Sequence, residues 1–196
     1  TPPARATYAD GRFLLQGRPT FVLGVYDTGL GYALDFFAMQ RKLFDRGGER
    51  ELSRLSGLNL YLNYQFGRMP LDAFHTFLDV LHRHRVMGLA TGNCFEKGSW
   101  RRYGPGSFSI MDAGYVRQIA RHPALFGYYL MDECHPNLLA ETQAHHRELK
   151  ALDPSGLTIG ATLGRGYAAP APWTDALDIL MTDPYPLYGS EPPEGY

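Results

Sequence analysis

The amino-acid sequence predicts an α/β protein with a parallel sheet, because short apolar segments alternate with helical ones along its 196 residues. Most of these segments are nearly continuously apolar, which is typical of parallel strands that are covered on both faces. Long connections separate these segments, as crossovers between parallel strands require. The predicted strands span residues 21–26, 59–64, 87–92, 125–131, 157–162 and 178–182.

A small hairpin is predicted ahead of the first strand. Residues 12–15 and 18–20 have strand-like sequences, and Gln16-Gly17 between them is typical of a tight turn. We expect a single domain over residues 1–196, in which residues 11–20 form this N-terminal hairpin.

Helices are predicted between the strands from apolar side chains that recur at three- and four-residue steps. The clearest stripe comprises Leu71, Phe74, Phe77, Leu78 and Leu81. A second helix is expected over residues 138–152, because Pro136 favours a helix start and Asp153-Pro154 a helix end. A shorter helical pattern occurs at residues 115–119, whereas residues 164–177 contain Pro and Gly and are predicted to be mostly loop.

Two architectures agree with strand–helix units in series: an open doubly wound sheet and a (β/α)8 barrel, also called a TIM barrel. A doubly wound dinucleotide-binding sheet is disfavoured, because no Gly-x-Gly-x-x-Gly follows the first predicted strand. A complete barrel usually needs about 250 residues. The sequence therefore predicts a TIM barrel of which about six βα units are present. Since the exposed edges of the first and sixth strands favour aggregation, we expect either further residues of the same protein, which is the favoured interpretation, or a partner chain to complete the barrel.

The composition argues against several classes of protein. Lys and Arg number 19 against 20 Asp and Glu, so a surface that follows nucleic-acid phosphates is not expected. No apolar run approaches the roughly 20 residues that span a bilayer, and the N-terminus does not resemble a signal peptide. The chain begins without Met, so we expect a mature product or a piece of a longer protein.

Polar side chains follow almost every predicted strand, which matters because TIM barrels place function at the carboxyl ends of their strands. In chain order these residues are Asp27, Asn63, Gln65, Asn93, Cys94, Asp132, Glu133, Thr162, Asp183 and Tyr185. The set is predicted to converge on one site. A plain structural explanation stays open, because strand ends border loops and loops are polar in any fold.

The strongest local signal is the aromatic and apolar run over residues 122–131, which ends in the adjacent carboxylates Asp132 and Glu133. Neighbouring residues of a strand point in opposite directions, so we expect only one of the two carboxylates to face the barrel axis squarely. A carboxyl group above an apolar floor has a raised pKa and can act as a general acid near neutral pH. Alternatively, one of the carboxylates caps the helix that begins near Pro136.

Residues 122–133 resemble the fourth-strand segment of the retaining (β/α)8 glycoside hydrolases, the clan that includes β-galactosidases and cellulases. Residues 11–26 and 178–186 are similar to the first- and sixth-strand regions of the same barrels. The resemblance implies Glu133 as the acid/base and Tyr185 as a residue near the substrate. It also implies a carbohydrate substrate and neither cofactor nor metal. Further candidate substrate-binding residues are Asp27, Asn63, Asn93, Asp132 and Asp183.

The sequence differs from the clan pattern at points that affect the mechanism. The clan usually has Asn before the catalytic Glu, whereas Asp132, when ionised, can only accept hydrogen bonds. The nucleophile of the clan follows a seventh strand, which this sequence does not contain. Retention needs a second carboxylate about 5–5.5 Å from the first. Asp27 and Asp183 are candidates within the chain, and the spacing does not choose between them.

Three functions stay open. The leading interpretation is a glycoside hydrolase that uses Glu133 as the proton donor. The second is a metal-dependent hydrolase or isomerase with a site rich in oxygen ligands. Its candidate ligands are Asp27, Asp132, Glu133, His135 and Asp183. The third is a carbohydrate-binding barrel remnant without catalysis. Export to the periplasm or out of the cell is favoured only by analogy with glycosidases that act on polymers.

The cysteines and the other histidines have simpler explanations. Cys94 and Cys134 follow neighbouring predicted strands, so either one disulfide or two unpaired thiols are expected. His82 and His84 are predicted at the solvated end of a helix rather than in a metal site.

Overall fold

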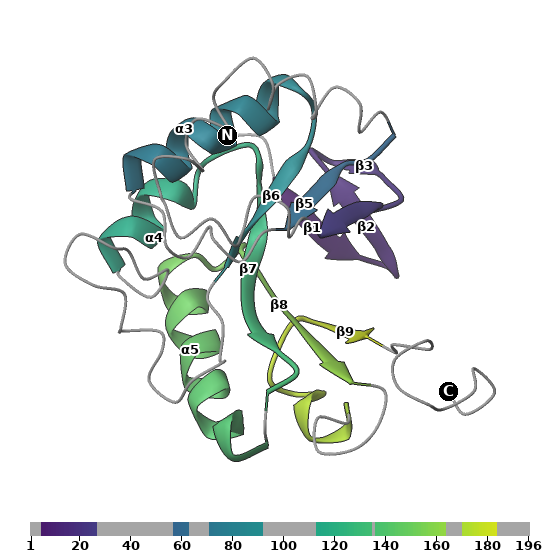
Figure 1. Ribbon diagram of the computed structural model, residues 1–196, viewed down its shortest axis with the longest axis vertical. Coiled ribbons are helices and arrows are strands. Elements are labelled where there is room, and N and C mark those ends of the chain that lie inside the picture. Colours follow the sequence, from purple (N-terminus) through teal and green to yellow (C-terminus); the bar gives the residue numbers. More distant parts are fainter. Residues whose placement is uncertain are drawn as a thin grey trace.

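A computed structural model describes residues 5–26, 57–62, 71–91, 113–134, 136–163 and 170–183. Within these ranges the chain has a six-stranded parallel sheet and a separate three-stranded antiparallel sheet. Figure 1 shows the helices on one side of the parallel sheet and the small sheet on the other. The predicted mixed α/β class is therefore confirmed.

The parallel sheet follows the order of the chain, because each strand pairs with the strand before it. Its strands are β4 (Gly24–Tyr26), β5 (Leu60–Leu62), β6 (Met87–Thr91), β7 (Leu125–Asp132), β8 (Leu157–Leu163) and β9 (Ile179–Asp183). All of them fall within or close to the predicted strands. A doubly wound sheet reverses its strand order at a switch point. The order described here never reverses, which agrees with the wall of a barrel.

Helices cover one face of the parallel sheet. They are α3 (Leu71–Arg83), α4 (Ala113–Ile119) and α5 (Leu139–Leu152), with the short 3-10 helices η3 (Pro136–Leu138) and η5 (Ala171–Trp173). The stripe predicted on α3 is buried, since Phe74, Phe77, Leu78 and Leu81 are all 0% exposed. The predicted helix over 138–152 is α5, preceded by one 3-10 turn. None of the described helices is long and apolar enough to span a membrane.

The N-terminal hairpin is larger than predicted. Its sheet contains β1 (Ala6–Ala9), β2 (Arg12–Leu15) and β3 (Arg18–Pro19). Both connections are two-residue turns, Asp10-Gly11 and Gln16-Gly17, whose residues have φ between 51° and 78°. Turns with two positive φ angles match the twist of antiparallel strands. The predicted hairpin over 11–20 is present as β2 and β3. The strand β1 was not predicted, although Asp-Gly between two strand-like segments is a strong hairpin signal.

Apolar side chains form a separate core on each face of the parallel sheet. On the helix side, Phe77 of α3 and Tyr115 of α4 belong to the larger core. On the opposite face, Phe126 and Tyr129 of β7 belong to a second core that includes Ala6 of β1. The small N-terminal sheet therefore covers part of the face that the helices leave open.

A buried ion pair joins the N-terminal segment to the turn between α5 and β8. The side chains of Arg5 and Asp153 are 7% and 5% exposed and form a salt bridge. Asp153 also accepts hydrogen bonds from the Tyr128 hydroxyl at 2.8 Å and from the Ser155 hydroxyl at 3.1 Å. Burial, with the neighbouring Asp153 charge, holds the pKa of Tyr128 far above its usual value, so the phenol remains a donor.

Candidate active site

The described part of the predicted site lies at the carboxyl ends of the parallel strands. Asp132 is the last residue of β7, and Glu133 follows it directly. Asp183 is the last residue of β9, and its backbone pairs with Leu163 of β8. Because the strands are parallel, these carboxylate residues share one edge of the sheet. Thr162 of β8 is 0% exposed, and its hydroxyl donates to the carbonyl oxygen of Met181 at 3.3 Å. The other candidates lie outside the described residues: Asp27, Asn63, Gln65, Asn93, Cys94, His135 and Tyr185.

A β-bulge in β7 decides how Asp132 is oriented. Tyr129 pairs with Ile159 of β8, and Met131 already pairs with the next residue, Gly160. Between these two pairs, β7 advances by two residues while β8 advances by one, which is a β-bulge. Regular alternation would place Tyr129 and Asp132 on opposite faces of the sheet. With the bulge, the Tyr129 hydroxyl donates to Asp132 Oδ1 at 2.7 Å.

Gly160 provides the space for this irregularity. A Cβ atom at this position would lie 2.2 Å from Met131 Cγ and 2.6 Å from Leu177 Cδ1. Distances below about 3 Å cannot be accommodated without movement of the neighbouring side chains. The absence of a side chain at Gly160 thus allows Met131 to pack against β8 where β7 bulges.

Glu133 has a left-handed backbone conformation, with φ of 52°. This region is uncommon for residues other than glycine and costs about 1 kcal/mol or more. The Glu133 N–H donates to the carbonyl oxygen of Ala161 at 2.8 Å, which anchors the turn to β8. The Glu133 side chain is half-buried. A strained residue at the carboxyl end of a barrel strand is typical of a functional position.

Asp132 is a buried acceptor at the top of an apolar face. Only 9% of its surface is exposed. Phe126 and Tyr129 of β7 belong to the same core as Ile159 and Ala161 of β8. An aromatic and apolar face therefore leads up to the carboxylate of Asp132. When ionised, this carboxylate can only accept hydrogen bonds, which suits it to bind a hydroxyl group.

The alternative that a carboxylate caps the helix near Pro136 stays a prediction. The helical segment begins with η3 at Pro136, and the residue before it lies outside the described residues. The N-cap residue of α5 is Leu138, whose side chain makes no capping hydrogen bond.

Cys134 fixes the segment that follows Glu133. It is only 3% exposed and is disulfide-bonded. The interpretation of Cys134 as an unpaired thiol is therefore wrong. The sequence has one other cysteine, Cys94. A covalent bond one residue after Glu133 restrains the end of β7, where the backbone is strained.

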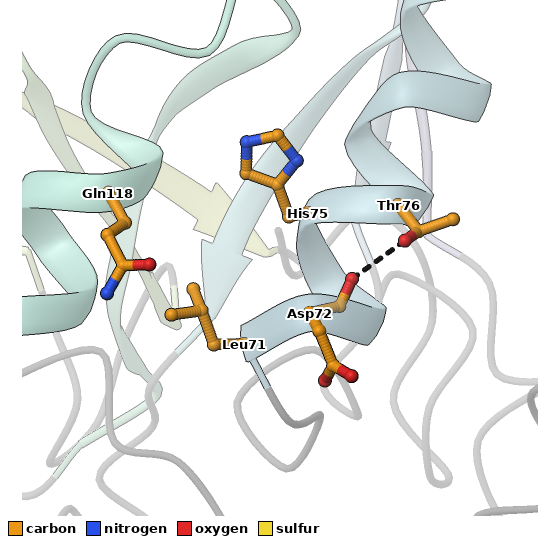
Figure 2. Close-up of a pocket in the computed structure, with 5 residues that line it drawn as sticks. All are labelled: Leu71, Asp72, His75, Thr76 and Gln118. Atoms are coloured by element: carbon orange, nitrogen blue, oxygen red, sulfur yellow. Dashed lines mark hydrogen bonds between the residues drawn. The ribbon is translucent and has the colours of Figure 1, made fainter.

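A pocket lies on the helix side of the sheet, as Figure 2 shows. Its lining residues are Leu71, Asp72, His75 and Thr76 of α3 and Gln118 of α4. Within it the Thr76 hydroxyl donates to the Asp72 carbonyl oxygen at 2.8 Å, so this hydroxyl supports the helix. All of the lining residues belong to helices and none to the predicted site. The pocket is therefore distinct from the strand ends that carry Asp132 and Glu133.

Comparison with known proteins establishes the fold. No protein-family model and no curated protein sequence matches the chain. An endo-1,4-beta-mannanase from Eisenia fetida is 13% identical with a TM-score of 0.61, over 96% of this chain and 76% of that chain. A beta-mannanase from the blue mussel Mytilus edulis is 13% identical with a TM-score of 0.61, over 97% and 78%. A beta-glucuronidase from Parabacteroides merdae is 16% identical with a TM-score of 0.59, over 91% and 22%.

These similar structures are glycoside hydrolases of the TIM-barrel clan. At 13% to 16% identity the likeness shows the fold alone. The shared fold and the consecutive strand order together confirm a barrel-type parallel sheet. The chain spans about three quarters of the two mannanases and less than a quarter of the beta-glucuronidase.

Proposed function

We propose that this chain belongs to a glycoside hydrolase and that Glu133 is its general acid/base. The observation that carries the proposal is the strained Glu133 directly after β7, where barrel enzymes place catalytic groups. The fold shared with mannanases supports the same class of enzyme. The resemblance of residues 122–133 to the fourth-strand segment of the clan points to the same carboxylate.

The proposed reaction is hydrolysis of an O-glycosidic bond by two carboxyl groups. Protonated Glu133 gives its proton to the glycosidic oxygen while the bond from that oxygen to the anomeric carbon breaks. In a retaining enzyme, a second carboxylate attacks the anomeric carbon and forms a covalent intermediate. Ionised Glu133 then takes a proton from water as the water oxygen displaces the second carboxylate. Both carboxyl groups are restored, and one water molecule is consumed for each bond cleaved.

The second carboxylate is proposed to come from a later strand of the same barrel. The resemblance assigns this group to a seventh strand, which further residues of the protein would supply. Within the chain, Asp183 ends β9 at the same sheet edge as Glu133, and Asp27 is the other candidate. We propose that the enzyme retains the configuration of the anomeric carbon and that the seventh-strand carboxylate is its nucleophile.

Asp132 is proposed to hold a sugar hydroxyl beside Glu133. Its carboxylate is buried and receives the Tyr129 hydroxyl, so its orientation is defined before substrate binds. Carbohydrates offer many hydroxyl donors to such an acceptor. The further substrate contacts are proposed to come from the other strand ends, namely Asp27, Asn63, Asn93, Asp183 and Tyr185.

The test is hydrolysis of a panel of β-linked glycans by the intact protein, with mannan and a glucuronide included. We expect E133Q to lower the rate on an active substrate by about 10²–10⁴-fold, the usual contribution of a general acid/base. Glu148 is an exposed residue of α5, and E148Q serves as the matched control with an unchanged rate. Equal rates for E133Q and the wild type would contradict the proposal.

Two further outcomes would favour the other functions. Loss of hydrolysis after treatment with EDTA would favour a metal-dependent hydrolase, whereas the proposed mechanism keeps its rate. Oligosaccharide binding without turnover, unaffected by E133Q, would favour a carbohydrate-binding barrel. Measurement of binding by calorimetry alongside turnover separates these outcomes.

A further inference from the structure

Three side chains of metal-binding type meet on the helix side of the sheet. His75 and Asp79 lie four residues apart on one face of α3, and His122 lies in the turn before β7. One ligand atom from each lies within 4.8 Å of the others. We call these residues the α3 histidine cluster. It lies apart from Asp132 and Glu133, which follow the carboxyl end of β7.

Asp79 is the centre of the cluster, because each of its oxygens faces a different histidine. His122 Nε2 lies 3.0 Å from Asp79 Oδ1, and His75 Nδ1 lies 3.8 Å from Asp79 Oδ2. The two imidazole rings are perpendicular, with centroids 5.0 Å apart. Two ligands of a tetrahedral zinc ion lie about 3.4 Å apart when each is about 2.1 Å from the metal. The two distances from Asp79 to the histidine nitrogens, 3.0 Å and 3.8 Å, lie on either side of this value.

We propose that the α3 histidine cluster binds a divalent transition-metal ion such as Zn²⁺ through His75, Asp79 and His122. Two nitrogen ligands and one oxygen ligand suit Zn²⁺, Ni²⁺ or Cu²⁺, whereas Mg²⁺ and Ca²⁺ prefer oxygen ligands. The side chains of His75 and Asp79 are 46% and 55% exposed, which gives the ion access from solvent. Three protein ligands leave a coordination position for water.

The α3 histidine cluster borders the pocket of Figure 2. His75 is both a member of the cluster and a lining residue of that pocket. In Figure 2 its ring projects from α3 on the side of Gln118. This pocket therefore gives water and small anions a route to the cluster.

A hydrogen bond of His122 limits the affinity of the site. His122 Nδ1 accepts the backbone N–H of Ala124 at 3.1 Å, so the ring proton of neutral His122 lies on Nε2. Coordination through Nε2 moves this proton to Nδ1, and the Ala124 N–H loses its acceptor. An unsatisfied buried donor is unfavourable. We therefore expect micromolar rather than nanomolar binding of zinc.

The test is calorimetric titration of the intact, EDTA-treated protein with ZnCl₂. We expect one ion per chain with a micromolar dissociation constant. CoCl₂ serves as a second probe, because visible absorption of bound Co²⁺ reports its ligands. H75A and D79N change exposed side chains and should each weaken binding by about tenfold or more. H84A removes a histidine just beyond α3 and outside the cluster, and should leave the affinity unchanged.

Binding of zinc that H75A and D79N leave unchanged would overturn the proposal, as would a dissociation constant in the millimolar range. A loss of affinity in H84A equal to that in H75A would also overturn it, because it would indicate general binding to surface histidines. The experiment is independent of the proposed hydrolase, since E133Q should bind zinc as the wild type does. Circular dichroism of H75A and D79N checks that both remain folded.

Discussion

Two neighbouring tyrosines of β7 make the same kind of hydrogen bond on opposite faces of the sheet. Tyr128 donates to Asp153 at 2.8 Å, and Tyr129 donates to Asp132 at 2.7 Å. Asp153 also forms a buried salt bridge with Arg5, so its charge is neutralised within the fold. Asp132 instead lies at a bulge and is followed by the strained Glu133. The same donor–acceptor pair thus supports stability in one place and a candidate active site in the other.

The largest expected effect comes from breaking the stabilising pair. D153A leaves the Arg5 guanidinium buried without its carboxylate, and we expect the free energy of unfolding to fall by about 3–5 kcal/mol. Urea denaturation measures the change. S155A is the control, since it keeps the ion pair and removes only the hydrogen bonds of the Ser155 hydroxyl with Asp153 and Arg5, each of which should contribute about 0.5–1.5 kcal/mol. A loss below about 1 kcal/mol in D153A would contradict the structural role of the pair.

The next largest effect should distinguish the role of Tyr129 from that of Tyr128. Y129F removes a hydrogen bond to buried Asp132, so we expect about 1–3 kcal/mol of destabilisation and about a tenfold loss of hydrolysis. Y128F, the matched variant on the other face, should lose stability while its hydrolysis stays within about twofold of the wild type. Comparison of kcat/KM and urea midpoints checks both. An equal loss of hydrolysis in the two variants would remove the functional distinction between them.

The strain at Glu133 gives a third and smaller effect. Glycine adopts positive φ without strain, so E133G should raise the free energy of unfolding by up to about 1 kcal/mol while hydrolysis is lost. E133Q keeps the strained backbone and should leave stability unchanged. Chemical denaturation of both variants tests this. A clear destabilisation by E133G would show that the side chain stabilises the strand end.

The smallest effect is a pH dependence that arises away from the site. Burial lowers the pKa of His146, whose Nδ1 lies 2.7 Å from the Thr158 hydroxyl. Asp178, Lys150 and Arg147 are the charged groups that act on it. Because the unfolded chain binds a proton to this histidine more readily, its contribution is complete above about pH 6.5 and decreases as the pH falls toward the folded pKa.

Denaturation at about pH 7.5 and about pH 5.5 measures this dependence. The H146Q variant should lose less stability than the wild type between the two values. A steeper loss in H146Q would mean that the sign of the effect is wrong.

Most of the fold could be predicted from periodicity. The stripe from Leu71 to Leu81 is the buried face of α3, and the apolar segments became parallel strands in chain order. These features depend on neighbours three or four residues apart and on long apolar runs, which a single sequence shows directly. The missed strand β1 also had a local signal, Asp10-Gly11, which has the positive φ angles of a hairpin turn.

The geometry of the site could be predicted only in part. The position of Asp132 and Glu133 at a strand end followed from the sequence, but the bulge after Tyr129 did not. Strict alternation cannot place Asp132 beside Tyr129, and the bulge depends on how β7 pairs with β8. The α3 histidine cluster was missed for a similar reason. His122 is 43 residues from Asp79, and only packing brings them together.

The most direct test of the central claim is how E133Q depends on the leaving group of the substrate. A general acid is needed when the departing oxygen is basic and is dispensable when it leaves easily. We predict a loss of kcat/KM, which reports the first step of the reaction, of about 10²–10⁴-fold on an oligosaccharide and only a small loss of kcat/KM on an activated aryl glycoside such as a dinitrophenyl glycoside. Equal losses of kcat/KM on the two substrates would contradict the role of Glu133 as the proton donor.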